Sequence, residues 1–426
     1  MTPTATETGP PAGRRPGRAR IWMLIGSFWP AREGGAERQC RRLIRQLVRR
    51  GQRVTVLTLR HGAGEKTVSR CDGAAVVRLG RAGPWSERGR RALARLLLPL
   101  ALAGARGERL RAHLVFWLSL PMVYVARLGF IRELRSFAAG RNMRGVLHVH
   151  ESGWLAGVGV ELARESGLRV LCKTASFPAL DPIAYDTPRR RKWDRCRRQA
   201  DAWIALTPAG QNDLLREGLA PETVHLVPNG VELPLESGAA SRSAEVLYVG
   251  NFSQGSAWKA FDVLFDAWIQ VVRRHPEARL TVVGGGDAAP WRRRLQAAGM
   301  LQAVRFAGAV GDVSPFYRAA GIFVLPSRVE GLSNALLEAQ SWGLACVVSD
   351  IPGNRAVVES EVNGLVVPVG AAPALANALL RMLEDPALRG RLGRAGRAKT
   401  EASFDIAQVA DQVQEIYRRL LDGGAA

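Results

Sequence analysis

Two glutamates stand on either side of a predicted helix start in the stretch RVEGLSNALLEAQSWG, which runs from Arg328 to Gly343. Ser333 is a suitable N-cap for the helix NALLEAQSW, so Glu330 falls on the preceding loop and Glu338 falls one to two turns into the helix. The first turn of a helix presents free backbone N–H groups and the positive end of its dipole, which suit a pyrophosphate. Carboxylates beside it are placed to accept hydrogen bonds from sugar or ribose hydroxyls. The spacing alone also fits two solvated surface glutamates.

The same helix predicts which way Glu338 points. Residues three, four and seven positions apart lie on one face of an α-helix, so Asn334, Glu338 and Ser341 share a face. The apolar face is expected to pack against a sheet and consists of Ala335, Leu336, Ala339 and Trp342. Glu338 is therefore expected to point away from the core.

The elements that must position these residues alternate between strands and helices. From Ile21 the chain reads strand, glycine-containing loop, helix from Gln39 and strand, which is a βαβ unit. Further short buried strands of this half are predicted over 145–151, 168–176, 202–208 and 224–230. A second series is predicted over 245–251, 278–286, 304–310, 321–327 and 345–350. The predicted fold class is α/β, with two Rossmann-like doubly wound domains that face each other across a ligand-binding cleft.

Changes in composition divide the chain. Residues 1–20 are rich in Pro, Gly, Thr and Arg and are predicted to be a disordered basic leader, without the apolar core of a signal peptide. The N-terminal domain is predicted over 21–233 and the C-terminal domain over 245–405, joined by a linker of small and polar residues over 234–244. The amphipathic stretch 406–426 is predicted to be a helix that packs back towards the N-terminal domain.

The composition describes a globular protein with an excess of positive charge. The 426 residues carry a formal net charge of +22 and are 47% hydrophobic. This charge predicts an acidic partner, and composition alone leaves anionic lipid, nucleic acid and phosphate-bearing substrates open. Arginines are spread along the chain rather than gathered with aromatics on one face, so no nucleic-acid partner is expected. The five scattered cysteines show no metal or redox spacing, which predicts a reducing, cytoplasmic location.

Two apolar stretches, Leu93–Ala105 and His113–Phe130, are candidates for membrane contact. Each is shorter than the about 20 apolar residues that a spanning helix needs. Their flanking arginines fit peripheral contact with an anionic membrane at the inner face of the plasma membrane, and two buried helices are an equally good interpretation. The basic run Arg189–Arg198 is either a solvated helix face or a site for anionic lipid or a phosphate-bearing acceptor.

The segment from Pro326 to Pro368 resembles the donor-binding signature of the retaining glycosyltransferases of family 4, which have the GT-B fold. Its matching anchors are Glu330, Gly331, Ser333, Asn334, Glu338, Gly343, Ser349, Asp350, Gly353 and the Asn363-Gly364 turn. The resemblance extends to SFWPAREGGAERQ near the N-terminus and to VPNGVE at the domain junction, and it is weakest between about Gly83 and Arg144.

The resemblance implies a donor, an acceptor and roles for individual residues. The expected substrates are a nucleotide sugar, UDP- or GDP-linked, held by the C-terminal domain, and a carbohydrate or lipid-linked acceptor held by the N-terminal domain. Glu338 is expected to hold the ribose hydroxyls, and Glu330 is expected to lie beside the transferred sugar. The phosphates and the sugar are expected to meet the backbone of Gly331, Leu332, Ser333 and Asn334.

Loops on both sides of the cleft complete the expected site. Gly34 and Gly35 match the family's Gly-Gly loop, whose backbone approaches the donor phosphate or the acceptor. Lys259 matches a lysine that stabilises the leaving diphosphate. Asn251 stands where many relatives have a second cation, an arginine, so a two-cation clamp would need another arginine. The loop 307–313, which contains Gly311, resembles the one whose backbone reads the nucleobase.

The strand LHVHE supplies a candidate for contact with the sugar. Alternation along a strand puts His148 and His150 on the same side, and His150 lies nearer the strand end. His150 therefore fits the family histidine that contacts the transferred sugar better than His148 does, and a structural role is the alternative for either. Thr174 and Ser176 occupy a position where relatives often have an acceptor-side polar loop.

Together these patterns predict a catalytic set of Glu330, Lys259 and His150. No pair of metal-binding aspartates is evident, and a helix N-terminus with Lys259 is expected to neutralise the diphosphate, so neither a metal nor a cofactor is expected. The basic charge and the apolar stretches predict a role in cell-envelope polysaccharide or glycolipid synthesis. The competing interpretations are a sugar-nucleotide epimerase of the same architecture and a catalytically degenerate basic binding or scaffold protein.

Overall fold

The computed structural model of the chain describes residues 20–28, 34–61, 65–80, 127–174, 198–235, 243–252 and 256–423. Several predictions lie outside these ranges. They are the leader except Arg20, the apolar stretch Leu93–Ala105, residues 113–126 of the second apolar stretch, Ser176, residues 189–197 of the basic run and residues 236–242 of the predicted linker.

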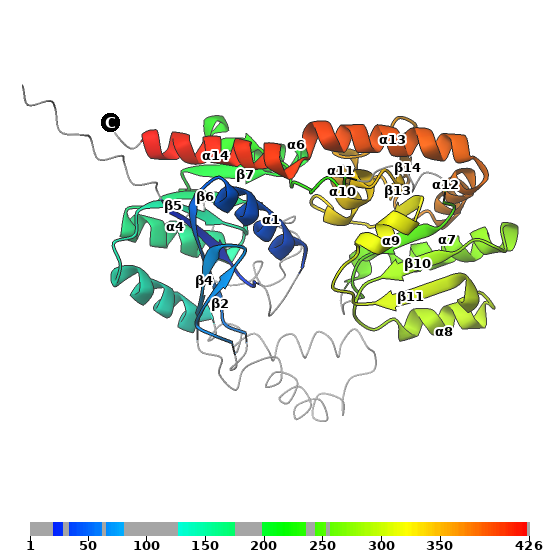
Figure 1. Cartoon of the computed structure of the whole chain (residues 1–426), viewed down its shortest axis with the longest axis horizontal. Helices are drawn as coiled ribbons and strands as arrows, with labels where there is room; N and C mark the ends of the chain where they lie inside the picture. The colour runs from blue at the N-terminus through cyan, green and yellow to red at the C-terminus, as the bar shows by residue number, and fades with distance from the viewer. Residues whose placement is uncertain are drawn as a thin grey trace, which may run out of the picture.

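The N-terminal half contains an eight-stranded sheet in the order β3-β4-β2-β1-β5-β6-β7-β8 (Figure 1). β3 and β4 pair antiparallel, and the other neighbouring strands pair parallel. The strands are β1 (Arg20–Ile25), β2 (Arg53–Leu59), β3 (Val68–Cys71), β4 (Ala74–Leu79), β5 (Gly145–Val149), β6 (Arg169–Lys173), β7 (Ala202–Ala205) and β8 (Val224–Leu226). The described helices of this half are α1 (Gly35–Arg49), one over 127–139, α4 (Trp154–Ser166), α6 (Pro208–Arg216) and the 3₁₀ turn η2 (Pro221–Thr223).

The C-terminal half contains a six-stranded parallel sheet in the order β11-β10-β9-β12-β13-β14. Its strands are β9 (Val246–Val249), β10 (Leu280–Val283), β11 (Val304–Gly308), β12 (Ile322–Leu325), β13 (Ala345–Ser349) and β14 (Leu365–Val367). The helices that follow the strands are α7 (Phe261–Arg274), α8 (Ala289–Ala297), α9 (Ser314–Ala319), α10 (Asn334–Ser341), α11 (Pro352–Arg355) and α12 (Ala372–Glu384). They are joined by the 3₁₀ turns η4 (Ser256–Lys259) and η5 (Leu301–Ala303) and are followed by α13 (Pro386–Ser403) and α14 (Ile406–Asp422).

The chain passes between the halves twice, and the two passages contact each other. The backbone N–H of Val231 donates to the carbonyl of Phe404 at 2.8 Å, and the N–H of Ile406 donates to the carbonyl of Val231 at 3.0 Å. α13 contacts α10 and β13, whereas α14 contacts α1 and β5. Figure 1 shows α13 and α14 in line along the upper edge of the molecule, so the last helix lies on the N-terminal half.

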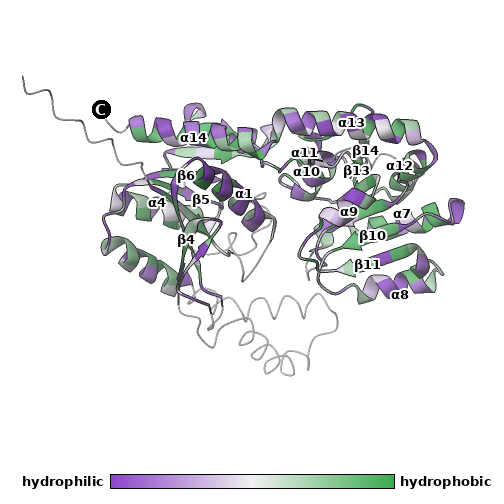
Figure 2. Cartoon of the chain, viewed as in Figure 1, coloured by the Kyte–Doolittle hydropathy of each residue, from purple (hydrophilic) through white to green (hydrophobic). Residues whose placement is uncertain are grey.

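Apolar sequence accounts for the central strands and for the way α1 packs. β12 (IFVL) and β13 (ACVVS) are apolar along nearly their whole length and are buried on both faces, as parallel strands covered by helices are. In α1 the residues at helical spacing, Leu43, Ile44 and Leu47, are buried, and its other face is charged. Figure 2 accordingly shows α1 as largely hydrophilic and β10 as hydrophobic. Within the described ranges, no helix is long and apolar enough to cross a membrane.

Candidate active site

A cavity of about 600 Å³ lies between the two halves, and residues at or just after the carboxyl ends of strands from both sheets line it. This is the place where open parallel sheets bind ligands. Eleven of the twelve predicted site residues line the cavity: Gly34, Gly35, His150, Asn251, Lys259, Glu330, Gly331, Leu332, Ser333, Asn334 and Glu338. At the loop after β11, Ala309 and Val310 line it rather than their neighbour Gly311.

Two of the predicted catalytic residues form an ion pair on the C-terminal wall. Lys259 Nζ lies 2.5 Å from Glu330 Oε1. The hydroxyl of Ser327 donates to the same carboxylate oxygen at 2.9 Å, and Lys259 Nζ lies 4.2 Å from the centroid of the Trp258 ring. These contacts hold the ammonium group at the end of η4 against the loop that precedes α10. The pair therefore presents one fixed positive and one fixed negative group to the cavity.

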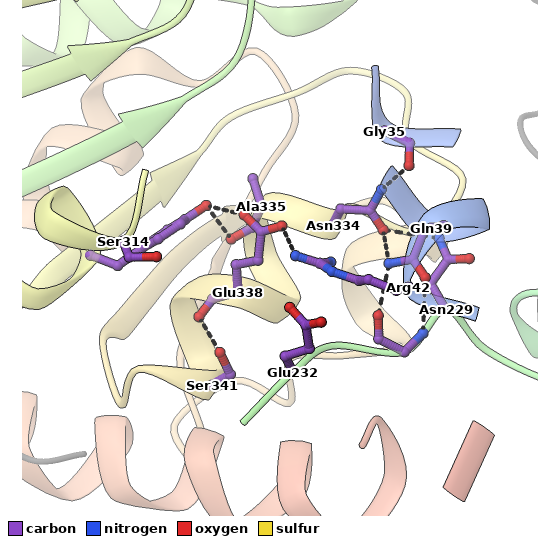
Figure 3. Close-up of polar contacts among 12 residues, drawn as sticks. Gly35, Gln39, Arg42, Asn229, Glu232, Ser314, Asn334, Ala335, Glu338 and Ser341 are labelled. Carbon is purple, nitrogen blue, oxygen red and sulfur yellow. Dashed lines mark hydrogen bonds and ion pairs between the residues drawn. The ribbon is translucent and has the colours of Figure 1, made fainter. Parts of the chain in front are cut away.

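The start of α10 is where the two halves make several of their polar contacts. Ser333 is the N-cap, and its hydroxyl accepts from the N–H of Leu336, as predicted from the sequence. Asn334 Nδ2 donates to the carbonyl of Gly35 at 2.8 Å, while its Oδ1 accepts from Gln39 Nε2 at 2.7 Å and from Asn229 Nδ2 at 3.1 Å (Figure 3). The Asn334 side chain thus bridges the domains beside the first turn of α10.

Two glycines that line the cavity, Gly35 and Gly284, allow neighbouring segments to pack closely against the backbone. A Cβ atom on Gly35 would lie 2.9 Å from Asn334 Nδ2, so a larger residue there would displace the Asn334 amide from this contact between the domains. Gly284 has a φ of +157°, and a Cβ there would lie 2.0 Å from the carbonyl oxygen of Gly250. Asn251 Oδ1 accepts from the N–H of Gly285 at 2.8 Å, so this side chain ties the loop after β9 to the loop after β10.

Glu338 has partners that its helical position alone did not indicate. Its Oε1 accepts from Arg42 Nη2 of α1 at 2.6 Å, and its Oε2 accepts from the Tyr317 hydroxyl at 2.9 Å. Figure 3 shows Arg42 reaching across the gap between the halves to Glu338. The residue is only 7% exposed, and Ser341 on the same face is buried. Glu338 lies on the helix face that is turned from the sheet and lines the cavity, but this face is covered by Arg42 of the other domain and by Tyr317 of α9. The alternative of two solvated glutamates is wrong, because Glu338 is buried in this way and Glu330 is held by Lys259 and Ser327.

His148 and His150 stack on each other at the end of β5, with ring centroids 4.2 Å apart. His150 borders the cavity, whereas His148 lies deeper and its Nδ1 is 2.6 Å from the Tyr417 hydroxyl of α14. Burial lowers the pKa of both imidazoles well below the usual value, and the positive charge of Lys173 lowers both further. Both rings are therefore neutral at pH 7, able to accept or donate one hydrogen bond at each nitrogen but not to act as cations.

The buried histidines predict that stability falls on acidification. Because the folded pKa is lowered, each histidine contributes fully above its unfolded pKa of about 6.5, and the contribution is lost as the pH falls below that value. Each should cost about 1.4 kcal/mol of unfolding free energy per pH unit between its unfolded and folded pKa. Urea unfolding of wild type and His148→Asn at pH 7.5, 6.0 and 5.0 measures this, and the variant should show the shallower loss. Equal slopes would contradict the neutral assignment of His148.

Several residues that line or support the site were missed by the sequence analysis. Arg42 and Gln39 of α1 contact α10, and Asn229 follows β8, so these contacts join segments far apart in the chain. Arg38, also on α1, lines the cavity, as does Lys173 at the end of β6. We recognised two of these segments, VPNGVE and the Gly-Gly segment, as motifs of the family. Their local sequence did not indicate that they contact α10. Thr174, the predicted acceptor-side residue, donates its hydroxyl to the carbonyl of Ile204 at 3.2 Å.

Two family models match consecutive parts of the chain. The model described as Glycosyltransferase Family 4 matches residues 33–234, and the model described as Glycosyl transferases group 1 matches residues 243–385. Two α/β domains that face each other across a cleft make up the GT-B fold of glycosyltransferases, and this chain has that fold. The chain belongs to glycosyltransferase family 4, the group 1 glycosyl transferases.

The curated relatives share sequence over part of their length. A phosphatidyl-myo-inositol mannosyltransferase of Mycobacterium tuberculosis is 33% identical over 222 residues, which are 49% of this chain and 57% of that protein. An alpha-D-kanosaminyltransferase of Streptomyces kanamyceticus is 29% identical over 257 residues, which are 56% of this chain and 64% of that protein. The chain thus spans little more than half the length of the curated relatives that it matches.

Solved structures resemble the chain over nearly its whole length. Sucrose-phosphate synthase from Thermosynechococcus elongatus superimposes with a TM-score of 0.72 at 24% identity, covering 95% of this chain and all of that chain. Anabaena HepE, solved with UDP and glucose, gives a TM-score of 0.70 at 16% identity and covers 94% of this chain and 99% of its own. At these identities the likeness establishes the fold.

Proposed function

We propose that this chain is a retaining glycosyltransferase that moves a sugar from a UDP- or GDP-linked donor to a hydroxyl group of a carbohydrate or lipid-linked acceptor, in cell-envelope polysaccharide or glycolipid synthesis. The observation that carries the proposal is a single cavity wall that combines Lys259, Glu330 and the first turn of α10. The names of the relatives support it, since the mycobacterial protein is a mannosyltransferase for phosphatidyl-myo-inositol and HepE was solved with UDP and glucose.

The diphosphate of the donor fits between the ammonium group of Lys259 and the N–H groups at the start of α10. Both the helix dipole and the lysine stabilise the negative charge that grows on the leaving phosphate. Asn251 is neutral and already accepts from the Gly285 N–H, so it supplies no second charge. Among the described lining residues, Arg38 is the one arginine, and it comes from the facing domain. Arg38 is our candidate for the second cation of the clamp.

Retention follows from a displacement on one face of the sugar. The acceptor oxygen forms a bond to the anomeric carbon as the bond from that carbon to the diphosphate oxygen breaks, and the acceptor proton passes to the leaving phosphate. The lining carboxylates support this route, because each is already held by a cation: Glu330 by Lys259 and Glu338 by Arg42. A carboxylate held in this way is a poor covalent nucleophile, so we assign Glu330 to orienting sugar hydroxyls and Glu338 to the ribose.

His150 completes the proposed catalytic set from the N-terminal wall. Its ring borders the cavity as a neutral hydrogen-bonding group, which suits a sugar hydroxyl. We further propose that the reaction needs no metal or cofactor, and that the protein works in the cytoplasm, in peripheral contact with the inner face of an anionic membrane. The apolar stretches on which the membrane proposal rests lie mostly outside the described residues.

A nucleotide screen tests the proposed function. In a screen of UDP, GDP, ADP, dTDP and CMP, either UDP or GDP should raise the melting temperature of the purified chain, equally with and without magnesium. A ligand that binds only the folded state adds about 2.7 kcal/mol to the unfolding free energy at a hundred times its Kd. With the matching donor and an acceptor, the glycosidic bond that forms should keep the donor's anomeric configuration in a proton NMR time course. If no nucleotide shifts the melting temperature, the proposal fails and a degenerate scaffold protein replaces it.

A further inference from the structure

Lys173 is a buried lysine that lines the cavity from the wall opposite the Lys259–Glu330 pair. It is the last residue of β6, with β5 on one side and β7 on the other. It is only 8% exposed, yet it lines the cavity. The N-terminal half therefore places a positive charge at the carboxyl end of its sheet, facing the space between the domains.

Among the described residues, the Lys173 side chain has no counter-charge of the kind that the other lysine of the cavity has. Lys259 is paired with Glu330, whereas no hydrogen bond or ion pair joins the Lys173 ammonium group to a described residue. The titratable groups that face it are His148 of β5, His150 directly after β5 and Cys40 of α1. The two histidines are neutral, and burial raises the pKa of the Cys40 thiol, so none of the three supplies a negative charge. A buried ammonium without an anion is costly for folding.

Lysine is rare in this chain, in which nearly all basic residues are arginines. Of its 60 basic residues, five are lysines: Lys66, Lys173, Lys192, Lys259 and Lys399. Of the four that lie in the described part of the chain, two line the cavity, from opposite walls. Lysine is a compact point charge that binds phosphate well, whereas the bulkier arginine is suited to planar, two-point contacts. Burial lowers the pKa of Lys173 to about 8, so the group is mostly protonated at pH 7 and is available to an anion.

We propose that Lys173 is the centre of an acceptor subsite, and that the acceptor carries a phosphate group which this lysine neutralises. This inference rests on the proposed function, since it names the chemistry of the second substrate. The donor diphosphate is assigned to the opposite wall, where Lys259 and the N-terminus of α10 lie. A phosphate on the acceptor would supply the missing counter-charge while its hydroxyl points across the cavity to the sugar.

The test compares two small probes that differ only in the phosphate, sn-glycerol 3-phosphate and glycerol. The chain is reductively methylated with ¹³C-formaldehyde, and the few lysine signals are followed by NMR; the signal missing from Lys173→Met assigns Lys173. We expect glycerol 3-phosphate to raise the pKa of the Lys173 signal and glycerol to leave it unchanged. We also expect calorimetry to show at least tenfold weaker binding of glycerol 3-phosphate to Lys173→Met and unchanged binding to Lys66→Met, a control outside the cavity.

Two further measurements separate this proposal from its alternatives. Lys173→Met should melt at a higher temperature than wild type, because it removes an uncompensated buried charge, so weaker probe binding is not a folding defect. Its Kd for the nucleotide identified by the screen should stay within twofold of wild type. If wild type does not prefer glycerol 3-phosphate to glycerol, or if Lys173→Met weakens nucleotide binding instead, the acceptor subsite is overturned. A chain that binds no nucleotide but still shows the Lys173-dependent preference refutes the proposed function and leaves the phosphate site standing.

Discussion

Replacing Lys259 with methionine should lower the turnover number about 100- to 1,000-fold, the usual effect of losing one group that stabilises the charge of a transition state. The ammonium group is fixed by Glu330 and by the ring of Trp258, so it needs no rearrangement when charge develops on the leaving phosphate. Methionine keeps most of the side-chain length and its packing on Trp258 but removes the charge. Steady-state kinetics with the donor and acceptor measure kcat and KM separately, and the loss should fall mainly on kcat.

One companion variant and one stability measurement make this result specific. Lys399→Met removes a lysine of α13 that does not line the cavity, and its turnover should match wild type. Lys259→Met also removes one of the two described donors to Glu330 and leaves Ser327, so the melting temperature of the variant is measured first and the assays are run well below it. A kcat for Lys259→Met within threefold of wild type would remove Lys259 from the catalytic set.

Much of the fold could be predicted from the sequence because its central strands are continuous apolar runs. β9, β12 and β13 lie within predicted strands, β1 starts one residue before its predicted strand, and each is almost wholly buried. The hairpin of β3 and β4 and the edge strand β14 were not predicted. β3 reads VSRC and β14 reads LVV, and neither is long enough to show a period. α1 begins at Gly35 rather than Gln39, because Glu37 accepts from the N–H of Gly34 and extends the helix start.

Some features of the candidate site could likewise be predicted from the sequence, and others could not. The N-cap at Ser333 and the loop glutamate Glu330 are local signals, readable from a dozen residues. The environment of Glu338 was not readable, because its partner Arg42 lies 296 positions away in the chain. Lys173 was missed for a different reason: a lysine at the end of a strand has no signature until the burial around it is known. The motifs of the site could therefore be predicted from the sequence, but the pairing of charged residues between the two domains could not.

Glu338 takes part in this pairing of charges between the domains, and its replacement is the second change from which we expect a large effect. Glu338→Ala should weaken binding of the matching nucleotide between tenfold and about a hundredfold. Hydrogen bonds to a charged group are worth about 1.5–3 kcal/mol each, and the proposed ribose contact is of that kind. Both carboxylate oxygens are engaged in the structure, one by Arg42 and one by Tyr317. A carboxylate has about four lone-pair sites, so a ribose hydroxyl can be added without displacing either partner. Calorimetric titration of wild type and variant measures the change, and Glu384→Ala, an exposed glutamate of α12, is the matched control.

Arg42→Met shows why nucleotide binding is weaker in Glu338→Ala, because the Glu338 carboxylate also joins α10 to α1. If Glu338 binds the ribose, Arg42→Met should keep nucleotide affinity within about threefold of wild type, since the acceptor oxygens remain. It should still lower the melting temperature, because a carboxylate that is mostly buried loses its ion-pair partner. If instead both variants weaken nucleotide binding by the same factor, Glu338 acts by holding the two domains together. The comparison therefore separates ligand binding from domain closure at the residue where the structure combines them.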